Sequence, residues 1–315
     1  MEELLQIRNL GVTFDTDLGE VQAVKDADFS VRRGEVFGIV GESGSGKSVT
    51  VKALMRIAPA NARIVHGSVL FDGTDLHGLS GEQFRPWQGR KIAMIFQDSL
   101  TALNPVYTAG SKMNELIRRM EKISGKEARS KALLLFEQVG IRDPERCYRS
   151  YPHELSGGMR QRIMIAMALA CSPELIIADE PTTSLDVTIQ AQILRLLKQI
   201  QKERGLTLIL ITHDLGVVAQ MCSRVTVMCG GYTVETGSVQ DIFHSPSHPY
   251  TQALIASMPK TGEKFEPFLE KSTGILQNGL CPFFDRCTQK TSLCSLELPP
   301  DREPEDGHRV RCHLI

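Results

Sequence analysis

The stretch GESGSGKS, residues 41–48, limits most strongly what this chain can fold into. It matches the phosphate-binding pattern G-x-x-x-x-G-K-[ST] at every fixed position. The apolar run before it, residues 36–40, predicts a buried strand, and residues 49–57 place apolar side chains at helical spacing. A strand, a glycine loop and a helix in this order predict an α/β nucleotide-binding fold.

The residue types of this loop suit phosphate binding. Gly44 and Gly46 let the backbone turn so that successive N–H groups point at phosphate oxygens, and the following helix adds its positive N-terminal end. Lys47 would bring a positive charge to the β- and γ-phosphates, and the Ser48 hydroxyl would bind Mg²⁺. The residues predicted to contact the nucleotide in this stretch are Gly41, Glu42, Ser43, Gly44, Ser45, Gly46, Lys47, Ser48 and Val49.

A second apolar run, LIIADE at residues 175–180, ends in two carboxylates. Parallel sheets bind ligands at the carboxyl ends of their strands, so Asp179 and Glu180 are candidates for the chemistry. Asp179 would complete the oxygen shell of Mg²⁺, and Glu180 would act as the general base toward the attacking water. Taken alone, the pattern also fits an ordinary strand that ends in solvated acids.

Three further polar residues complete the candidate catalytic set. Gln97 follows an apolar run, and its amide could reach both the metal and the lytic water. His213 follows another predicted strand, from which an imidazole could hydrogen-bond the γ-phosphate. Asp186 ends the stretch TTSLD, shortly after Glu180.

The most specific stretch is LSGGMRQR, residues 155–162. Its Ser-Gly-Gly opens an apolar helix and so forms a second anion-binding helix N-terminus, which a single active site does not need. This stretch resembles the signature motif of the ATP-binding cassette (ABC) ATPases. The resemblance covers about residues 4–240, because the other motifs occur in that family's order: the phosphate loop, Gln97, LIIADE, the loop ending at Asp186, and His213.

The resemblance implies that two ATPase domains pair head to tail. ATP and Mg²⁺ held by the phosphate loop of one chain would be capped by the signature residues Ser156, Gly157 and Gly158 of a partner chain, with Asp186 in a loop at the dimer interface. Phe14 matches the aromatic residue that stacks on adenine in the family, where Tyr is usual. Kinases and GTPases share the phosphate loop, but they lack the signature and a histidine that corresponds to His213.

Three stretches narrow the resemblance to importers of oligopeptides, dipeptides and nickel: FQDSLTALNP, EPTTSLDVTIQAQIL and SPSHPYTQALIASMP. Ser184 stands where family members often carry Ala. The subfamily implies ATP hydrolysis that powers binding-protein-dependent import, with di- or oligopeptides as the expected cargo and nickel or modified peptides as alternatives. The implied partners are a second, related ATPase chain in an expected heterodimer, two transmembrane permease subunits and an extracytoplasmic substrate-binding protein.

Composition excludes several other classes. The formal net charge of −1 gives no basic field, which argues against nucleic acid as a partner. No secretory signal is visible, and the longest apolar runs are far shorter than the roughly 18 residues of a membrane span. With the resemblance, this predicts a peripheral subunit at the cytoplasmic face of the membrane. A soluble cassette ATPase of DNA repair or translation is the distant alternative, but its long coiled coil or second cassette is missing here.

The predicted organisation is an ATPase domain at residues 1–235 followed by an extension at 236–315. The fold class is α/β: a phosphate-loop NTPase (RecA-like) core with an antiparallel β portion near the N-terminus, a helical signature subdomain and a small cysteine-containing C-terminal lobe. The helical subdomain is predicted at about residues 99–162, where apolar residues recur at helical spacing. The extension is rich in Pro, Cys and short polar segments, which suits a small lobe that needs a crosslink.

Four of the eight cysteines lie in this extension, at Cys281, Cys287, Cys294 and Cys312. An expected cytosolic setting disfavours disulfides, and the spacing alone leaves zinc, an iron–sulfur cluster and free thiols open. CPFFDRC, residues 281–287, resembles the C-P-x-x-x-R-C pattern of the importer subfamily, which implies a [4Fe–4S] cluster. His308 and His313 lie near Cys312 in the sequence and could also bind zinc, so zinc stays a candidate. The remaining cysteines are scattered beside apolar segments and are predicted to be small buried residues.

Overall fold

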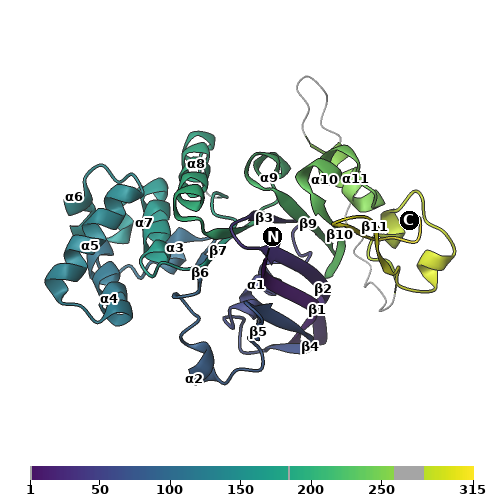
Figure 1. Ribbon diagram of the computed structural model, residues 1–315, viewed down its shortest axis with the longest axis horizontal. Coiled ribbons are helices and arrows are strands. Elements are labelled where there is room, and N and C mark those ends of the chain that lie inside the picture. The colour runs from purple at the N-terminus through teal and green to yellow at the C-terminus, as the bar shows by residue number, and fades with distance from the viewer. Residues whose placement is uncertain (1, 184, 259–279) are drawn as a thin grey trace. The chain divides into compact units, whose positions relative to one another are not determined.

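The computed structural model describes residues 2–183, 185–258 and 280–315, which fall into two compact units (Figure 1). The first unit is Met1–Leu79 with Leu210–Ile315, and the second is Ser80–Ile209. Ser184 and Pro259, which belong to the stretches that carry the family resemblance, lie outside the described residues. The domain boundary at 235 and the limits of the helical subdomain stay predictions.

The first unit is built on a sheet in the order β5-β4-β1-β2-β10-β9-β3. Near the N-terminus β1 pairs antiparallel with both β2 and β4, and this confirms the predicted antiparallel portion. At the other end β3 runs parallel to β9. The strands are β1 (Glu3–Thr16), β2 (Gly19–Arg32), β3 (Val36–Val40), β4 (Ala62–Phe71), β5 (Thr74–Asp75), β9 (Arg224–Cys229), β10 (Tyr232–Ser238), β11 (Asp301–Glu305) and β12 (His308–Arg311).

Strand β3 is buried at all five residues, as its unbroken apolar run predicts. The chain then passes through the glycine loop into α1. The helix begins directly after Gly46, whose backbone is in the left-handed conformation. The helices of this unit are α1 (Lys47–Leu54), α9 (Leu215–Met221), α10 (Val239–His244) and α11 (Pro249–Ala256), with short 3₁₀ helices η2 (Phe284–Arg286) and η3 (Leu293–Ser295).

The second unit combines strands in the order β8-β7-β6 with a group of helices, and β6 runs parallel to β7. Helices α4, α5, α6 and α7 pack on one another (Figure 1). Its elements are β6 (Ile92–Ile95), β7 (Leu175–Asp179), β8 (Thr207–Ile211), α2 (Gly81–Phe84), α3 (Ser99–Ala102), α4 (Ala109–Glu121), α5 (Gly125–Gln138), α6 (Pro144–Arg149), η1 (Pro152–Glu154), α7 (Gly157–Leu169) and α8 (Val187–Arg204).

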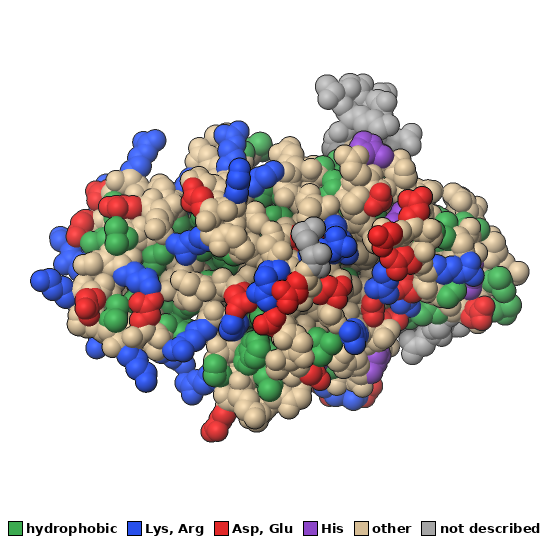
Figure 2. Space-filling model, in the orientation of Figure 1, with side chains coloured by type: hydrophobic (Ala, Val, Ile, Leu, Met, Phe, Trp, Pro, Cys, Tyr) green, Lys and Arg blue, Asp and Glu red, His purple; other side chains and the backbone are tan. Residues whose placement is uncertain are grey.

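Charged side chains of both signs are interspersed over the face drawn in Figure 2, as expected from the near-zero net charge. Among the described residues, no helix combines the length and the apolar character needed to cross a membrane.

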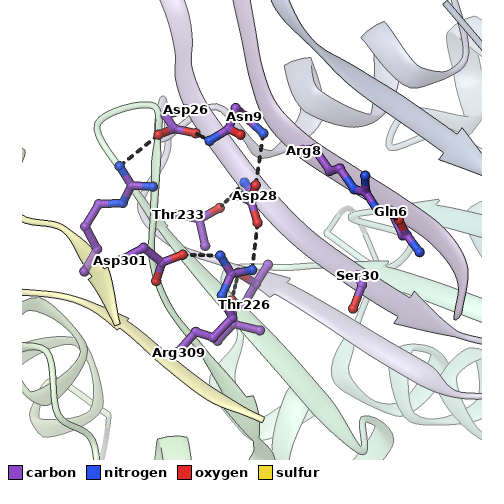
Figure 3. A network of polar contacts seen from close by, with 12 residues as sticks. Gln6, Arg8, Asn9, Asp26, Asp28, Ser30, Thr226, Thr233, Asp301 and Arg309 are labelled. Atoms are coloured by element: carbon purple, nitrogen blue, oxygen red, sulfur yellow. Dashed lines mark hydrogen bonds and ion pairs between the residues drawn. The ribbon is translucent and has the colours of Figure 1, made fainter. Parts of the chain in front are cut away.

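The C-terminal hairpin β11–β12 is tied to β2 by a polar network, drawn in Figure 3. Arg309 donates to Asp28 over 2.7 Å and also pairs with Asp301. Arg311 forms an ion pair of 2.9 Å with Asp26, so two arginines of one strand meet two aspartates of another. These contacts join the last residues of the chain to its first β-hairpin.

The same hairpin makes a second polar contact, through the buried side chain of His308. The Nε2 of His308 lies 2.8 Å from an Oε1 oxygen of Glu235 on β10, and both side chains are almost fully buried. Glu235 also accepts hydrogen bonds from the backbone N–H groups of Ser247 and His248. The hydrogen bond to Glu235 raises the pKa of His308 above its usual value of 6.5, because the carboxylate stabilises the protonated ring.

We expect His308→Gln to destabilise the chain in a pH-dependent way. Because the folded-state pKa of His308 is raised, its stabilising contribution is complete below pH 6.5 and is lost as the pH rises through the folded value. The substitution should lower the unfolding free energy by about 2 kcal/mol at pH 6 and by less at pH 9. Urea unfolding of both proteins across this range measures the difference, and an equal loss at every pH would contradict the ionic pairing.

Candidate nucleotide site

The phosphate loop lies tightly against two strands, β9 and β2. Gly41 has φ 147°, and a Cβ atom there would come within 2.2 Å of the Met228 carbonyl oxygen. Gly46 has φ 101°, and its Cβ would lie 2.9 Å from the Ala23 carbonyl oxygen. Both positions therefore require glycine, for the backbone angle and for the close approach. The loop conformation is fixed by the sheet behind it.

Lys47 lies inside this loop with only 5% of its surface exposed. Its Nζ donates to the carbonyl oxygens of Gly41, at 2.8 Å, and Glu42, at 2.7 Å, and lies 3.4 Å from the Ser45 hydroxyl oxygen. The ammonium group is thus placed at the start of α1, where the helix N-terminus also attracts anions. This arrangement can bind a phosphate group.

The other predicted contacts of the first unit lie on its strands and strand ends. Within the loop, Ser43 and Gly44 are exposed, Ser45 is buried, and Ser48 and Val49 are half-buried. Phe14 is half-buried on β1, paired with Val21 of β2 and with Ala62 of β4. His213 is exposed, and its neighbour Thr212 donates a backbone hydrogen bond to Ile39 on β3. His213 therefore lies at the same sheet edge as the start of the phosphate loop.

The second unit brings together the predicted hydrolysis residues. Because β6 and β7 are parallel, their carboxyl ends meet at one edge, where Gln97 and Glu180 follow them. The amide Nε2 of Gln97 donates to Oε2 of Glu180 over 2.8 Å. Thr183 donates its hydroxyl to the same oxygen, also over 2.8 Å. Asp179, at the end of β7, is only 2% exposed. Two donors thus orient the Glu180 carboxylate beside a buried aspartate.

Glu180 also has an unusual backbone. Its φ of 45° lies in the left-handed region, which costs a residue with a side chain about 1 kcal/mol or more. Strain of this kind is concentrated at functional sites, where the surroundings hold a side chain in a required direction. Sequence reasoning missed Thr183 as a partner of Glu180. The two threonines that directly follow the stretch DEP in the sequence could have indicated a hydroxyl partner for Glu180.

The signature residues and the loop of Asp186 lie side by side in the second unit. Ser156 caps α7 by accepting from the Met159 N–H group, and Asp186 caps α8 by accepting from the Ile189 N–H group. A Cβ atom on Gly158 would meet the side chain of Ile189 at 2.7 Å, so the glycine allows the two helix starts to approach. Ser156 and Asp186 are both exposed, and Gly157 is half-buried.

The predicted nucleotide residues are thus divided between the units. Phe14, the phosphate loop and His213 belong to the first, and Gln97, Asp179, Glu180, Asp186 and the signature belong to the second. In the second unit Gln97 meets Glu180, and the signature meets the helix start at Asp186; in the first unit His213 lies at the sheet edge where the phosphate loop begins. That the two groups act on one ATP stays a prediction.

The four C-terminal cysteines line one small cavity in the first unit. Cys281, Cys294 and Cys312 are buried, and Cys287 is half-buried. Burial raises the pKa of Cys281 to about 11. Within the described residues, no three His, Cys, Asp or Glu side chains are arranged to hold a metal ion. Of the scattered cysteines, Cys147 and Cys229 are buried, as predicted, but Cys171 and Cys222 are only half-buried.

His248 lines the same cavity and was not predicted as a site residue. It is 1% exposed, and its Nδ1 accepts a hydrogen bond of 3.0 Å from the N–H group of Tyr250. Burial lowers the pKa of His248 to about 4, so the ring is neutral at pH 7 and its proton is on Nε2. This Nε2–H group has no acceptor among the described residues. A buried donor therefore accompanies the four thiols.

The helix N-terminus at Ser156 separates this chain from other phosphate-loop proteins. A single nucleotide needs one glycine loop, and the chain presents a second glycine-bearing helix start next to the Asp186 loop. With the parallel strands and the oriented Glu180 carboxylate, the fold and the site define an ATP-binding cassette.

Comparison with family models agrees with this class. Residues 24–183 match the model of the ABC transporter family, and residues 234–294 match the model described as the oligopeptide/dipeptide transporter C-terminal region. The chain belongs to the ABC transporter family. The predicted membership, including the importer subfamily, is therefore confirmed.

The similarity to known proteins extends over nearly the full length of this chain. The dipeptide transport ATP-binding protein DppD of Bacillus subtilis is 47% identical, covering 100% of this chain and 95% of its own length. The oligopeptide transport ATP-binding protein OppD of the same organism is 52% identical, covering 99% and 89%. The DppD protein of Escherichia coli is 44% identical, covering 98% and 96%.

A solved structure confirms the phosphate-loop fold. The dimeric, post-hydrolysis state of the ATP-binding cassette MJ0796, bound to ADP and Pi, superimposes with a TM-score of 0.67 and 29% identity. The match covers 75% of this chain and 98% of that one.

Proposed function

We propose that this chain is the ATP-hydrolysing subunit of an ABC importer for di- or oligopeptides. The observation that carries the proposal is the Glu180 carboxylate, oriented by Gln97 and Thr183 beside the buried Asp179. The peptide cargo is supported by the match of residues 234–294 and by the names of the similar proteins. Nickel and modified peptides are the alternative cargoes.

The nucleotide residues take the following roles in this proposal. Lys47 and the N–H groups of the phosphate loop after Glu42 bind the β- and γ-phosphates, and Phe14 stacks on adenine. The predicted contact of Glu42 with the nucleotide is not made by its N–H group, which donates to Tyr250. Ser48, Gln97 and Asp179 would hold Mg²⁺, whose bound charge neutralises the phosphates; the buried Asp179 carboxylate suits this hard ion. Glu180 accepts a proton from the attacking water, and His213 donates a hydrogen bond to the γ-phosphate.

The exposed signature supports a dimer of cassettes. Ser156 is exposed at the start of α7, where Gly157 and Gly158 are half-buried, and the three would cap the ATP of a partner chain, with Asp186 beside them. The dimeric cassette similar to this chain supports such pairing. We propose a related ATPase chain as the partner, two permease subunits in the membrane and a substrate-binding protein outside it. The chain would then be peripheral at the cytoplasmic face.

In this assembly ATP binding closes the cassette dimer, and hydrolysis reopens it. The permease subunits respond by alternating access to the cargo. The ATPase domain would span residues 1–235 with its helical subdomain at 99–162, and residues 236–315 form the extension.

We further propose that the cysteine cavity holds a [4Fe–4S] cluster. Four thiols and the buried Nε2–H donor of His248 suit a sulfide-containing anion, which accepts hydrogen bonds and bears thiolate ligands. Four thiolates also suit a single zinc ion, which stays the alternative occupant, and each of the two nearby histidines has one ring nitrogen in a hydrogen bond. His308 is bound to Glu235, and His313 to the carbonyl oxygen of Glu297. When bound, the cluster would crosslink the extension through Cys281, Cys287, Cys294 and Cys312.

Glu180→Gln should abolish turnover while ATP binding is retained. The amide cannot take the proton of the attacking water, so the turnover rate of the purified full chain should fall about 100-fold or more. Glu203→Gln, an exposed carboxylate of α8 in the same unit, is the matched control and should hydrolyse ATP as the native chain does. If Glu180→Gln kept its turnover, the general-base role would be wrong.

The cluster proposal predicts about four iron and four sulfide per chain after anaerobic purification, with visible absorption. Cys294→Ser should lose most of both, because it removes one ligand. Cys171→Ser, in the second unit, should retain them. A native chain that folds but contains neither iron nor sulfide would contradict the proposal, and a zinc content of about one per chain would replace it.

A further inference from the structure

The C-terminal extension shares a hydrophobic core with the strands around the phosphate loop. Val40, the last residue before the loop, belongs to the same buried cluster as Tyr250, Phe283 and Cys281. Residues of β9, β10, α9 and α10 belong to this cluster as well. The extension is thus packed directly behind the strand that carries the loop.

A bidentate ion pair connects this extension to the loop. Nη1 of Arg286 lies 2.7 Å from Oε1 of Glu42, and Nη2 lies 3.1 Å from Oε2. The two residues are 244 positions apart, and their side chains are 13% and 27% exposed. The guanidinium also lies over the rings of Tyr250 and Phe283, at 5.8 and 5.1 Å from their centres. Stacking and two parallel hydrogen bonds fix the arginine in one geometry.

The backbone of Glu42 is held from both sides. Its N–H group donates to the hydroxyl oxygen of Tyr250 over 3.0 Å. Its carbonyl oxygen accepts from Lys47 at 2.7 Å and from the N–H group of Ser45 at 3.1 Å. Tyr250 is fully buried, and burial raises the pKa of its hydroxyl, which stays neutral. Glu42 therefore connects the extension to the lysine of the loop.

We infer that Arg286 and Tyr250 are positioning residues for the nucleotide site and hold the phosphate loop through Glu42. The inference rests on the proposed ATP-binding function. Because the N–H group of Glu42 is bound to Tyr250, Glu42 serves as an anchor of the loop and does not donate to a phosphate. Arg286 also neutralises a carboxylate that lies in the loop, where an unpaired negative charge would repel ATP.

The test compares Arg286→Gln with the native full chain. Losing a charged, bidentate hydrogen bond should raise the Kd and KM for Mg·ATP about 10-fold. The saturated turnover rate should change much less, since the general base Glu180 is untouched. Arg286→Lys, which keeps the positive charge but cannot form the bidentate pair with Glu42, should give an intermediate Kd for Mg·ATP. In a chain that already carries Glu42→Gln, adding Arg286→Gln should raise the Kd for Mg·ATP little further, because the carboxylate partner of Arg286 is already removed.

Arg309→Gln is the matched control. It removes another arginine that ties the extension to the sheet, through Asp28, without any contact to the loop. It should bind Mg·ATP as the native chain does. Equal effects of the two substitutions, or native affinity in Arg286→Gln, would overturn the inference.

Hydrogen exchange of nucleotide-free protein tests the positioning without relying on ATP. Backbone amides of residues 41–48 should exchange faster in Arg286→Gln and Arg286→Lys than in Arg309→Gln. Unchanged exchange would overturn the inference, even if the affinity fell. If the native chain bound no Mg·ATP, the proposed function would be wrong, and exchange would still decide whether Arg286 holds the loop.

Discussion

The close approach of Gly41 to the carbonyl oxygen of Met228 is the constraint on which the nucleotide site depends. No side chain fits between the loop and β9, so the loop follows the sheet backbone and its carbonyl oxygens converge on the Lys47 ammonium. A buried ammonium is costly unless hydrogen bonds compensate it, and here the loop supplies them. The binding conformation is therefore built into the strand order, because β9 must lie directly beside β3.

The same packing joins the phosphate loop to the end of the chain. Tyr250 and Phe283 enter the core behind β3, and Arg286 reaches the loop from the segment between Cys281 and Cys287. The hairpin β11–β12 is fixed separately, through arginine–aspartate pairs to β2. The extension is thus part of the first unit, and two residues of the stretches that mark the importer subfamily, Tyr250 and Arg286, also contact the loop that we propose binds ATP.

Local motifs predicted much of the fold and the candidate site. The strand, loop and helix around Lys47 follow from local spacing, and the approach of Gln97 to Glu180 follows from the rule that parallel strands end at one edge. The pair Glu42–Arg286 could not be predicted, because it joins side chains from distant segments whose packing no local pattern encodes. His248 was missed for a similar reason, since only the fold places it at the cysteine cavity.

We propose that the loop around Lys47 is preformed to bind Mg·ATP. Calorimetric titration of the full chain tests it most directly, with Lys47→Met as the comparison. We expect one Mg·ATP to bind per native chain. Removal of the ammonium should raise the Kd at least about 10-fold, because a charged hydrogen bond to phosphate is lost. Equal affinity of the two proteins, or no binding to the native chain, would contradict it.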